Sequence, residues 1–113
     1  MQPLIHKASV HLTSNRLPSS VSLGDVANLR LRNDDTIIVT LDLPSRLPFG
    51  LGESSEFVLG TLGQQARDFL KPALQRAAHL RVRIVEFEPA HLSRNGRTRI
   101  YISVWGDPKA LLP

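Results

Sequence analysis

The sequence predicts a small α+β protein, mainly β, in which a closed β-barrel is capped by one α-helix. Three observations predict this fold. Two pairs of segments alternate between apolar and polar residues, one segment with helical spacing lies between the pairs, and 113 residues with 42% hydrophobic content can bury one core but not two. A small barrel with a helical cap satisfies this order of elements.

The first 20 residues are expected to form an N-terminal extension with one weakly signalled strand. Ala8, Val10 and Leu12 alternate with polar residues, whereas the segment 13–20 contains Pro18 and is interpreted as a loop.

A hairpin is expected next. Its first strand is indicated by apolar residues of one parity, namely Val21, Leu23, Ala27, Leu29 and Leu31. Asn33-Asp34-Asp35 supplies turn residues, and Thr36 to Leu43 is rich in β-branched and apolar side chains. Residues 44–60 contain several prolines and glycines and show little periodicity, so we expect a long loop there.

An amphipathic helix follows. The apolar residues at helical spacing are Ala66, Phe69, Leu70, Ala73, Leu74 and Ala77. Thr61 and Gln64 are spaced as a capping box, which predicts the start of the helix. Pro72 lies in its interior, where it removes a backbone donor, so we expect a bend and not a break.

A second, longer hairpin is expected after the helix. In its first strand Leu80, Val82 and Ile84 point one way and the intervening arginines the other, and a slip of one residue at Val85 predicts a β-bulge. Asn95-Gly96 suits a tight turn, and the second strand again alternates, with Ile100, Ile102 and Val104 on its apolar face.

Composition narrows the function classes. Fourteen Lys and Arg against ten Asp and Glu give a formal charge of +4, which favours polyanionic partners. The chain has no cysteine, so disulfides, thiolate catalysis and cysteine-ligated zinc are excluded. No apolar run is long enough to span a bilayer and no secretory signal is visible, so we expect a soluble, cytoplasmic protein.

Several of these segments together resemble the staphylococcal nuclease family. Gly63 to Leu70 resembles the family's Gly-x-x-Ala-x-x-Phe-x helix start, and Asn95-Gly96-Arg97 resembles its Tyr-Gly-Arg turn, with Asn95 in place of the tyrosine. The strands 80–84 and 100–104 continue the likeness. The resemblance implies a five-stranded, OB-fold-like barrel over residues 21–106, followed by a short tail, residues 107–113.

The resemblance also implies a calcium site. Leu23-Gly24-Asp25-Val26 is similar to the family's Asp-Gly-Asp-Thr, and the segment 41–45 is similar to its Val-Asp-x-Pro-Glu, which places Asp25 and Asp42 on the metal-binding positions. Carboxylates from neighbouring strands are suitable ligands for Ca²⁺. The alternative is structural, with Asp25 as a turn or bulge residue and Asp42 capping a loop.

The catalytic set that the resemblance implies is incomplete. Arg97 matches one of the family's two arginines, but Ile37 stands near the position of the other, and Ser45 stands at the position of the glutamate that serves as general base. Losing a positioned transition-state donor commonly costs about a hundred- to a thousandfold in rate. Glu53 or Glu56 and Arg46 are the only substitutes that we identify.

Binding without cleavage needs fewer groups. The last hairpin combines basic and aromatic residues, namely Arg81, Arg83, Arg94, Arg99, Tyr101 and Trp105. We therefore expect binding of a single-stranded nucleic acid. Three readings stay open beside it: a calcium-dependent nuclease, a protein-interaction or oligomeric scaffold, and arginines that merely solubilise a strand while Trp105 closes the core.

The resemblance does not extend to the family's C-terminal helices. We expect the apolar surface that those helices would cover to be covered by residues 1–12 or by a second copy of the chain in a homodimer.

Overall fold

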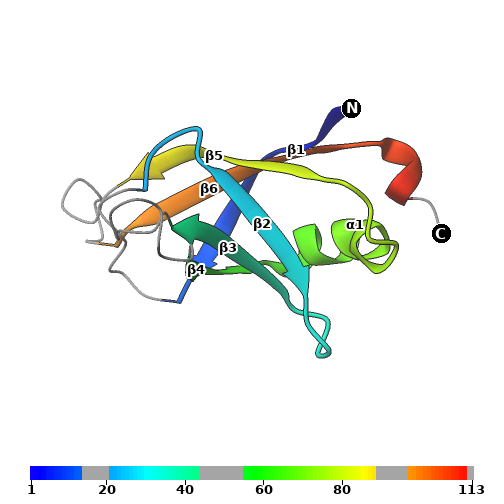
Figure 1. Cartoon of the computed structure of the whole chain (residues 1–113), viewed down its shortest axis with the longest axis horizontal. Coiled ribbons are helices and arrows are strands. Elements are labelled where there is room, and N and C mark those ends of the chain that lie inside the picture. The colour runs from blue at the N-terminus through cyan, green and yellow to red at the C-terminus, as the bar shows by residue number, and fades with distance from the viewer. Residues whose placement is uncertain (14–20, 44–54, 89–96, 112–113) are drawn as a thin grey trace, which may run out of the picture.

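The computed structural model describes residues 1–13, 21–43, 55–88 and 97–111 (Figure 1). Its elements are β1 (Gln2–Leu12), β2 (Val26–Leu31), β3 (Ile37–Leu43), β4 (Ser55–Leu62), α1 (Gln64–Gln75), β5 (Arg81–Glu88), β6 (Arg99–Gly106) and the 3-10 helix η3 (Pro108–Leu111). The strands form a closed antiparallel barrel in the order β1-β4-β3-β2-β5-β6. The predicted class, a mainly β domain with a closed barrel and one α-helix, is confirmed for the described residues.

The barrel has six strands, and the prediction of five was wrong. β1 pairs antiparallel with both β4 and β6, so β4 and β6 run in the same direction and β1 separates them. The N-terminal extension thus supplies a barrel strand. The prediction of a loop over residues 44–60 was also wrong for residues 55–60, which belong to β4; residues 44–54 lie outside the described part of the chain.

Gly60 lies within β4, where it has a packing role and does not indicate a loop. Its Cα pairs with that of Leu12 on β1, and a Cβ at position 60 would lie 2.1 Å from the backbone oxygen of His11. The Thr13 amide donates to the Leu59 carbonyl beside this contact, at 3.1 Å. The glycine therefore permits two backbones to approach closely.

The first predicted hairpin is confirmed as β2 and β3, paired from Asn28 with Thr40 to Leu31 with Ile37. Leu23, however, is exposed, because Gly24 adopts a φ of +87° in a turn and breaks the expected alternation. This turn is joined to β5 by a hydrogen bond from the Gly24 amide to the Ile84 carbonyl, 2.8 Å long.

The second hairpin is also present as β5 and β6. The register shifts between Ile84 and Glu86, which confirms the predicted bulge. The Asn95-Gly96 turn lies outside the described residues.

Helix α1 runs through Pro72 without interruption, and its apolar face is narrower than predicted. Its N-cap is Gly63 with no side-chain cap bond, so the capping box of Thr61 and Gln64 is wrong. Ala77 lies beyond the helix end at a φ of +53°, and Phe69 is partly exposed. No helix among the described residues is both long and apolar enough to cross a lipid bilayer.

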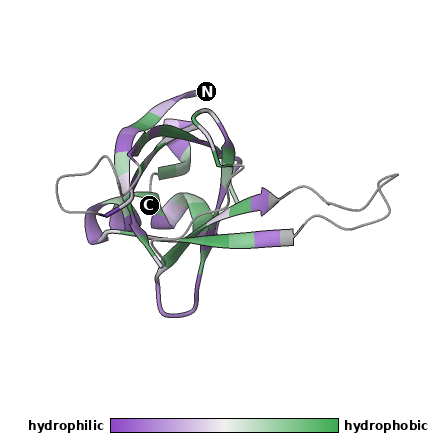
Figure 2. Ribbon diagram, turned by 90° about the vertical axis from the view of Figure 1, so that its left-hand side faces the viewer, coloured by the Kyte–Doolittle hydropathy of each residue, from purple (hydrophilic) through white to green (hydrophobic). Residues whose placement is uncertain are grey.

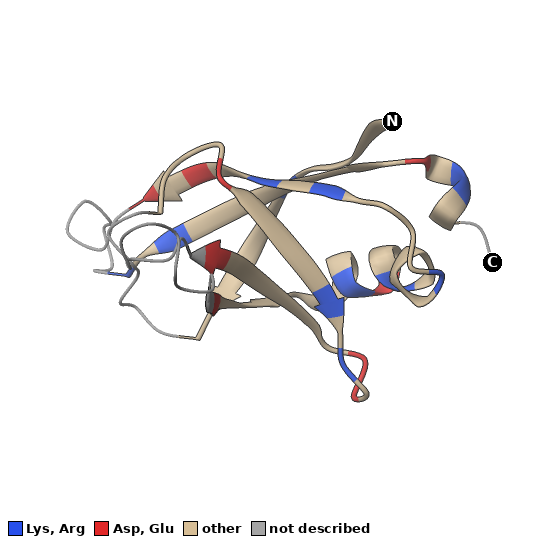
Figure 3. Cartoon of the chain, in the orientation of Figure 1, with Lys and Arg blue, Asp and Glu red and all other residues tan. Residues whose placement is uncertain are grey.

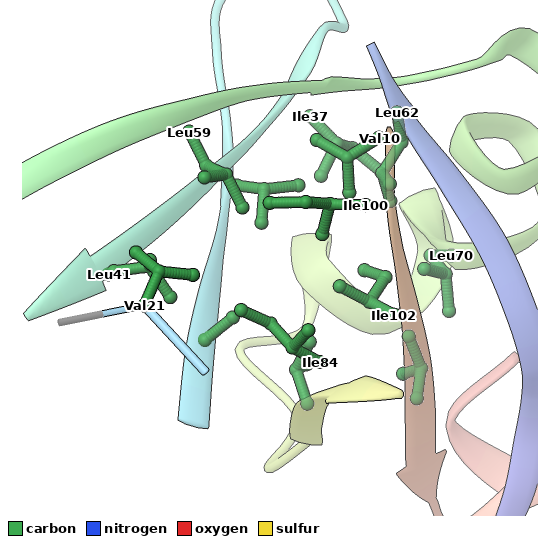
Figure 4. Packing of buried hydrophobic residues seen from close by; sticks show 14 residues of the cluster. Val10, Val21, Ile37, Leu41, Leu59, Leu62, Leu70, Ile84, Ile100 and Ile102 are labelled. Carbon is green, nitrogen blue, oxygen red and sulfur yellow. The ribbon is translucent and has the colours of Figure 1, made fainter. Parts of the chain in front are cut away.

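The core fills the barrel interior. Side chains of β3, β5 and β6 that alternate inward meet Leu70 of α1, which is fully buried, and Figure 4 shows Leu70 beside Ile102. In the view along the barrel, α1 lies behind the ring of strands (Figure 2). η3 packs on α1, where Arg76 Nη1 donates to the Ala110 carbonyl at 3.2 Å.

Candidate nucleic-acid interface

The outer face of β1, β6 and β5 contains most of the predicted nucleic-acid-binding residues. Ile100, Ile102 and Val104 are fully buried in the barrel, so alternation along β6 directs Arg99, Tyr101 and Trp105 outward. These inward and outward sets are those that the sequence predicts.

Trp105 lies on this outer face between two neighbours. It is directly opposite Arg81 on β5 and opposite Pro3 on β1. Its side chain is 41% exposed, so Trp105 does not close the core. We call Arg81, Arg83 and Trp105 the Trp105 surface.

Arg83 has a structural contact as well. Its Nη1 donates to the carbonyl oxygen of Gly24 at 2.9 Å, which ties the turn before β2 to β5. A guanidinium has five N–H donors, so one such bond leaves donor capacity for a phosphate. Arg81 is exposed and lies at the start of β5.

The other half of the outer face is balanced in charge. Tyr101 is opposite Glu86, and Arg99 is opposite Glu88. Lys7 of β1 forms an ion pair with Glu86, and its Nζ lies 4.4 Å from the centre of the Tyr101 ring. The hydrogen bond to Glu86 raises the pKa of Lys7. β5 accordingly changes from basic to acidic along its length (Figure 3).

Two further predicted residues precede β6 in the sequence. Arg97, the predicted catalytic arginine, is exposed just before β6. Arg94 lies outside the described residues.

The two predicted metal ligands are each engaged locally. The carboxylate of Asp25 accepts hydrogen bonds from the Ser22 amide at 2.9 Å and from the Ser22 hydroxyl at 3.1 Å. Asp42 accepts one from the Asn28 side-chain amide at 3.2 Å, and its partner across the β3–β4 ladder is Glu56. Asp25 thus acts as a turn residue, as its structural alternative predicts.

Two of the other residues that the nuclease resemblance involves are described. Ile37 is fully buried in the core, and Glu56 forms an ion pair with Arg30 at 3.1 Å. Ser45, Arg46 and Glu53 lie outside the described residues. Within the described part of the chain, no group of three or more His, Asp or Glu side chains is placed to hold a metal ion.

Two residues near the outer face, Lys7 and Phe69, are not predicted as site residues from the sequence. Lys7 was overlooked because the first strand is only weakly signalled, and its contact with Tyr101 joins opposite ends of the chain. Phe69 was assigned to the core by its helical spacing, yet it is 44% exposed beside an open groove of about 750 Å³ between β1 and the start of α1.

Comparison of the chain with protein-family models, with curated proteins and with solved structures finds no match.

Proposed function

We propose that this protein binds single-stranded nucleic acid on the outer face of β1, β6 and β5, without cleaving it. The observation that supports this most directly is Trp105, an exposed indole next to Arg81 in the strand register. Tryptophan is usually well buried, and an exposed one beside a cation is suited to stacking on a base.

The chemistry of a single strand matches the Trp105 surface. Its bases offer π-faces to the indole, and its phosphates are suitable acceptors for the guanidinium groups of Arg81 and Arg83. The net charge of +4 assists the approach of a polyanion. Arg99 and Tyr101 contribute less in this proposal, because Glu88 and Glu86 lie directly opposite them.

A calcium-dependent nuclease of the staphylococcal type is the second candidate. The exposed Arg97 and the pair Asp25 and Asp42 favour it by resemblance alone. The buried Ile37 and the hydrogen bonds already made by both carboxylates favour binding over cleavage. A scaffold without nucleic-acid contact is the third candidate. A homodimer stays a proposal that rests on the resemblance alone, and residues 2–12 form β1 of the barrel.

The proposal is tested by titrating the protein with unlabelled oligo(dT) and recording its intrinsic tryptophan fluorescence. The chain has one tryptophan, so a change in its emission reports on the Trp105 surface directly. We expect quenching that weakens with salt, with a log–log slope of about −0.7 for each phosphate neutralised.

The same mixture with Ca²⁺, and then with a chelator, separates the candidates. Intact oligonucleotide and salt-sensitive quenching support binding without cleavage. Cleavage that stops on chelation supports the nuclease, whereas an unchanged Trp105 emission at every oligonucleotide concentration supports the scaffold.

A further inference from the structure

A groove lies between β1 and α1, beside the proposed interface. It has a volume of about 750 Å³, within the range typical of small-ligand sites. Its walls are largely apolar and include Leu4, Ile5 and Ala8 of β1 and Ala66 and Phe69 of α1.

Phe69 is the unusual residue of this groove. Its ring is 44% exposed although its spacing along α1 matches that of the buried Leu70 and Ala73. Exposed aromatic rings that line a concavity are typical of sites where a flat ligand packs.

The groove adjoins the proposed interface across a single strand. Pro3 of β1 is opposite Trp105, and the next two residues, Leu4 and Ile5, line the groove. Lys7 also lines it while its Nζ lies over the Tyr101 ring on the outer face. The two sites are therefore separated by β1, and adjacent strands lie about 5 Å apart.

The groove's polar groups suit a base and its phosphate. Gln64 and Gln65 at its mouth have side-chain amides, which both donate and accept hydrogen bonds and so match the edge of a nucleobase. Of the described residues that line it, Lys7 and His11 are basic and none is acidic, and the Lys7 ammonium is paired with Glu86 outside the groove lining.

We propose that this groove holds one base of the single strand bound at the Trp105 surface, packed against the Phe69 ring. The inference rests on the proposed function, because the groove adjoins the outer face on which the nucleic acid must first bind.

This inference is tested by measuring how tightly oligo(dT) binds to the Phe69→Ala variant, with Trp105 emission as the signal. We expect affinity to fall roughly five- to a hundredfold, the range that base–aromatic stacking provides. The matched control is Val58→Ala on β4, which removes a side chain of similar exposure, 43%, away from the groove and should leave affinity within about twofold. Far-ultraviolet circular dichroism of both variants verifies that they fold.

A measurement on the unmodified protein makes the test independent of the variant. In ¹H–¹⁵N NMR spectra, saturating oligo(dT) should shift the backbone amides of Gln65 and Ala66. Unshifted amides together with an unchanged affinity of Phe69→Ala, while Trp105 is still quenched, would overturn the groove inference and leave the proposed function standing. Absence of quenching in the unmodified protein would overturn both. Retention of a groove-bound apolar dye at saturating oligo(dT) would indicate a different occupant and also overturn the inference.

Discussion

Replacing Gly60 with alanine tests the closure of the barrel by β1. The new Cβ would lie 2.1 Å from the His11 carbonyl oxygen, 2.8 Å from its carbon and 2.9 Å from the Leu12 Cα. All three atoms belong to the backbone, so no side chain can rotate away. Because ordinary contacts begin at 3.4 Å, β1 must retreat from β4 by about 1 Å.

The expected cost follows from this displacement. Forced overpacking costs about 1–3 kcal/mol, and the adjacent hydrogen bond from Thr13 to Leu59, 3.1 Å long, would be stretched beyond its useful length, at about 1 kcal/mol. We therefore expect Gly60→Ala to lower the free energy of unfolding by about 2–4 kcal/mol, out of a total of about 5–15 kcal/mol. The corresponding fall in Tm is about 10–25 °C.

Urea and thermal unfolding followed by circular dichroism measure this change. Gly63→Ala is the control, because its Cβ would lie 3.4 Å from His11 Nε2, in ordinary contact, and its φ is −70°. As the N-cap of α1 this position should lose no more than about 1 kcal/mol. Equal stability of the two variants, within about 0.5 kcal/mol, would refute the close approach of β1 and β4 and with it the six-stranded closure.

The remaining predictions concern α1, the interface and a turn. Ala77→Gly should raise the free energy of unfolding by about 0.5–1 kcal/mol in urea titrations, because glycine adopts the φ of +53° without the cost that alanine pays; a lower stability would contradict this. Arg81→Ala should reduce the salt slope of oligo(dT) binding by about 0.7, and Arg99→Ala by clearly less because of Glu88; equal slopes would count against the assignment of the Trp105 surface. Asp34→Ala should destabilise the protein at neutral pH, because the Thr36 amide donates to the Asp34 carboxylate at 3.2 Å and lowers its pKa. Because the folded-state pKa is lowered, the stabilisation by the ionised carboxylate is present above the unfolded-state pKa and is lost as the pH falls through the folded-state pKa. The difference between variant and parent in urea titrations should therefore shrink as the pH falls into the acid range; a constant difference would contradict the linkage.

The sequence predicts individual strands and turns of this fold better than it predicts which strands pair with one another. Alternation of Ile100, Ile102 and Val104 determines which side of β6 faces the core, and the slip at Val85 located the bulge. Which strand closes the barrel depends on pairing between distant segments, which no local pattern encodes. β4 was missed because Gly60 was interpreted as a loop residue, although its lack of a Cβ serves the contact with β1.

For the candidate site, too, the sequence predicts which residues share a face but not which residues lie opposite them. Alternation predicted that Arg81, Arg99 and Trp105 share an outer face, but not that Glu86 and Glu88 neutralise part of it across the ladder. Helical spacing predicted a buried Phe69, whereas the position of β1 leaves that ring beside an open groove. The resemblance places Asp25 on a metal position, and the structure adds the hydrogen bonds from Ser22 to its carboxylate, which no sequence motif predicts.

The position of β1 between β4 and β6 also affects how the protein is made. Val10 pairs with both Leu62 and Ile100, so β1 is translated before both of the strands with which it pairs. At about 5–20 residues per second, β6 follows roughly 5–20 s later. Throughout that interval the nascent barrel is an unclosed sheet whose first strand is available to chaperones or to other unfinished chains, and the ring is completed only when translation has passed β6.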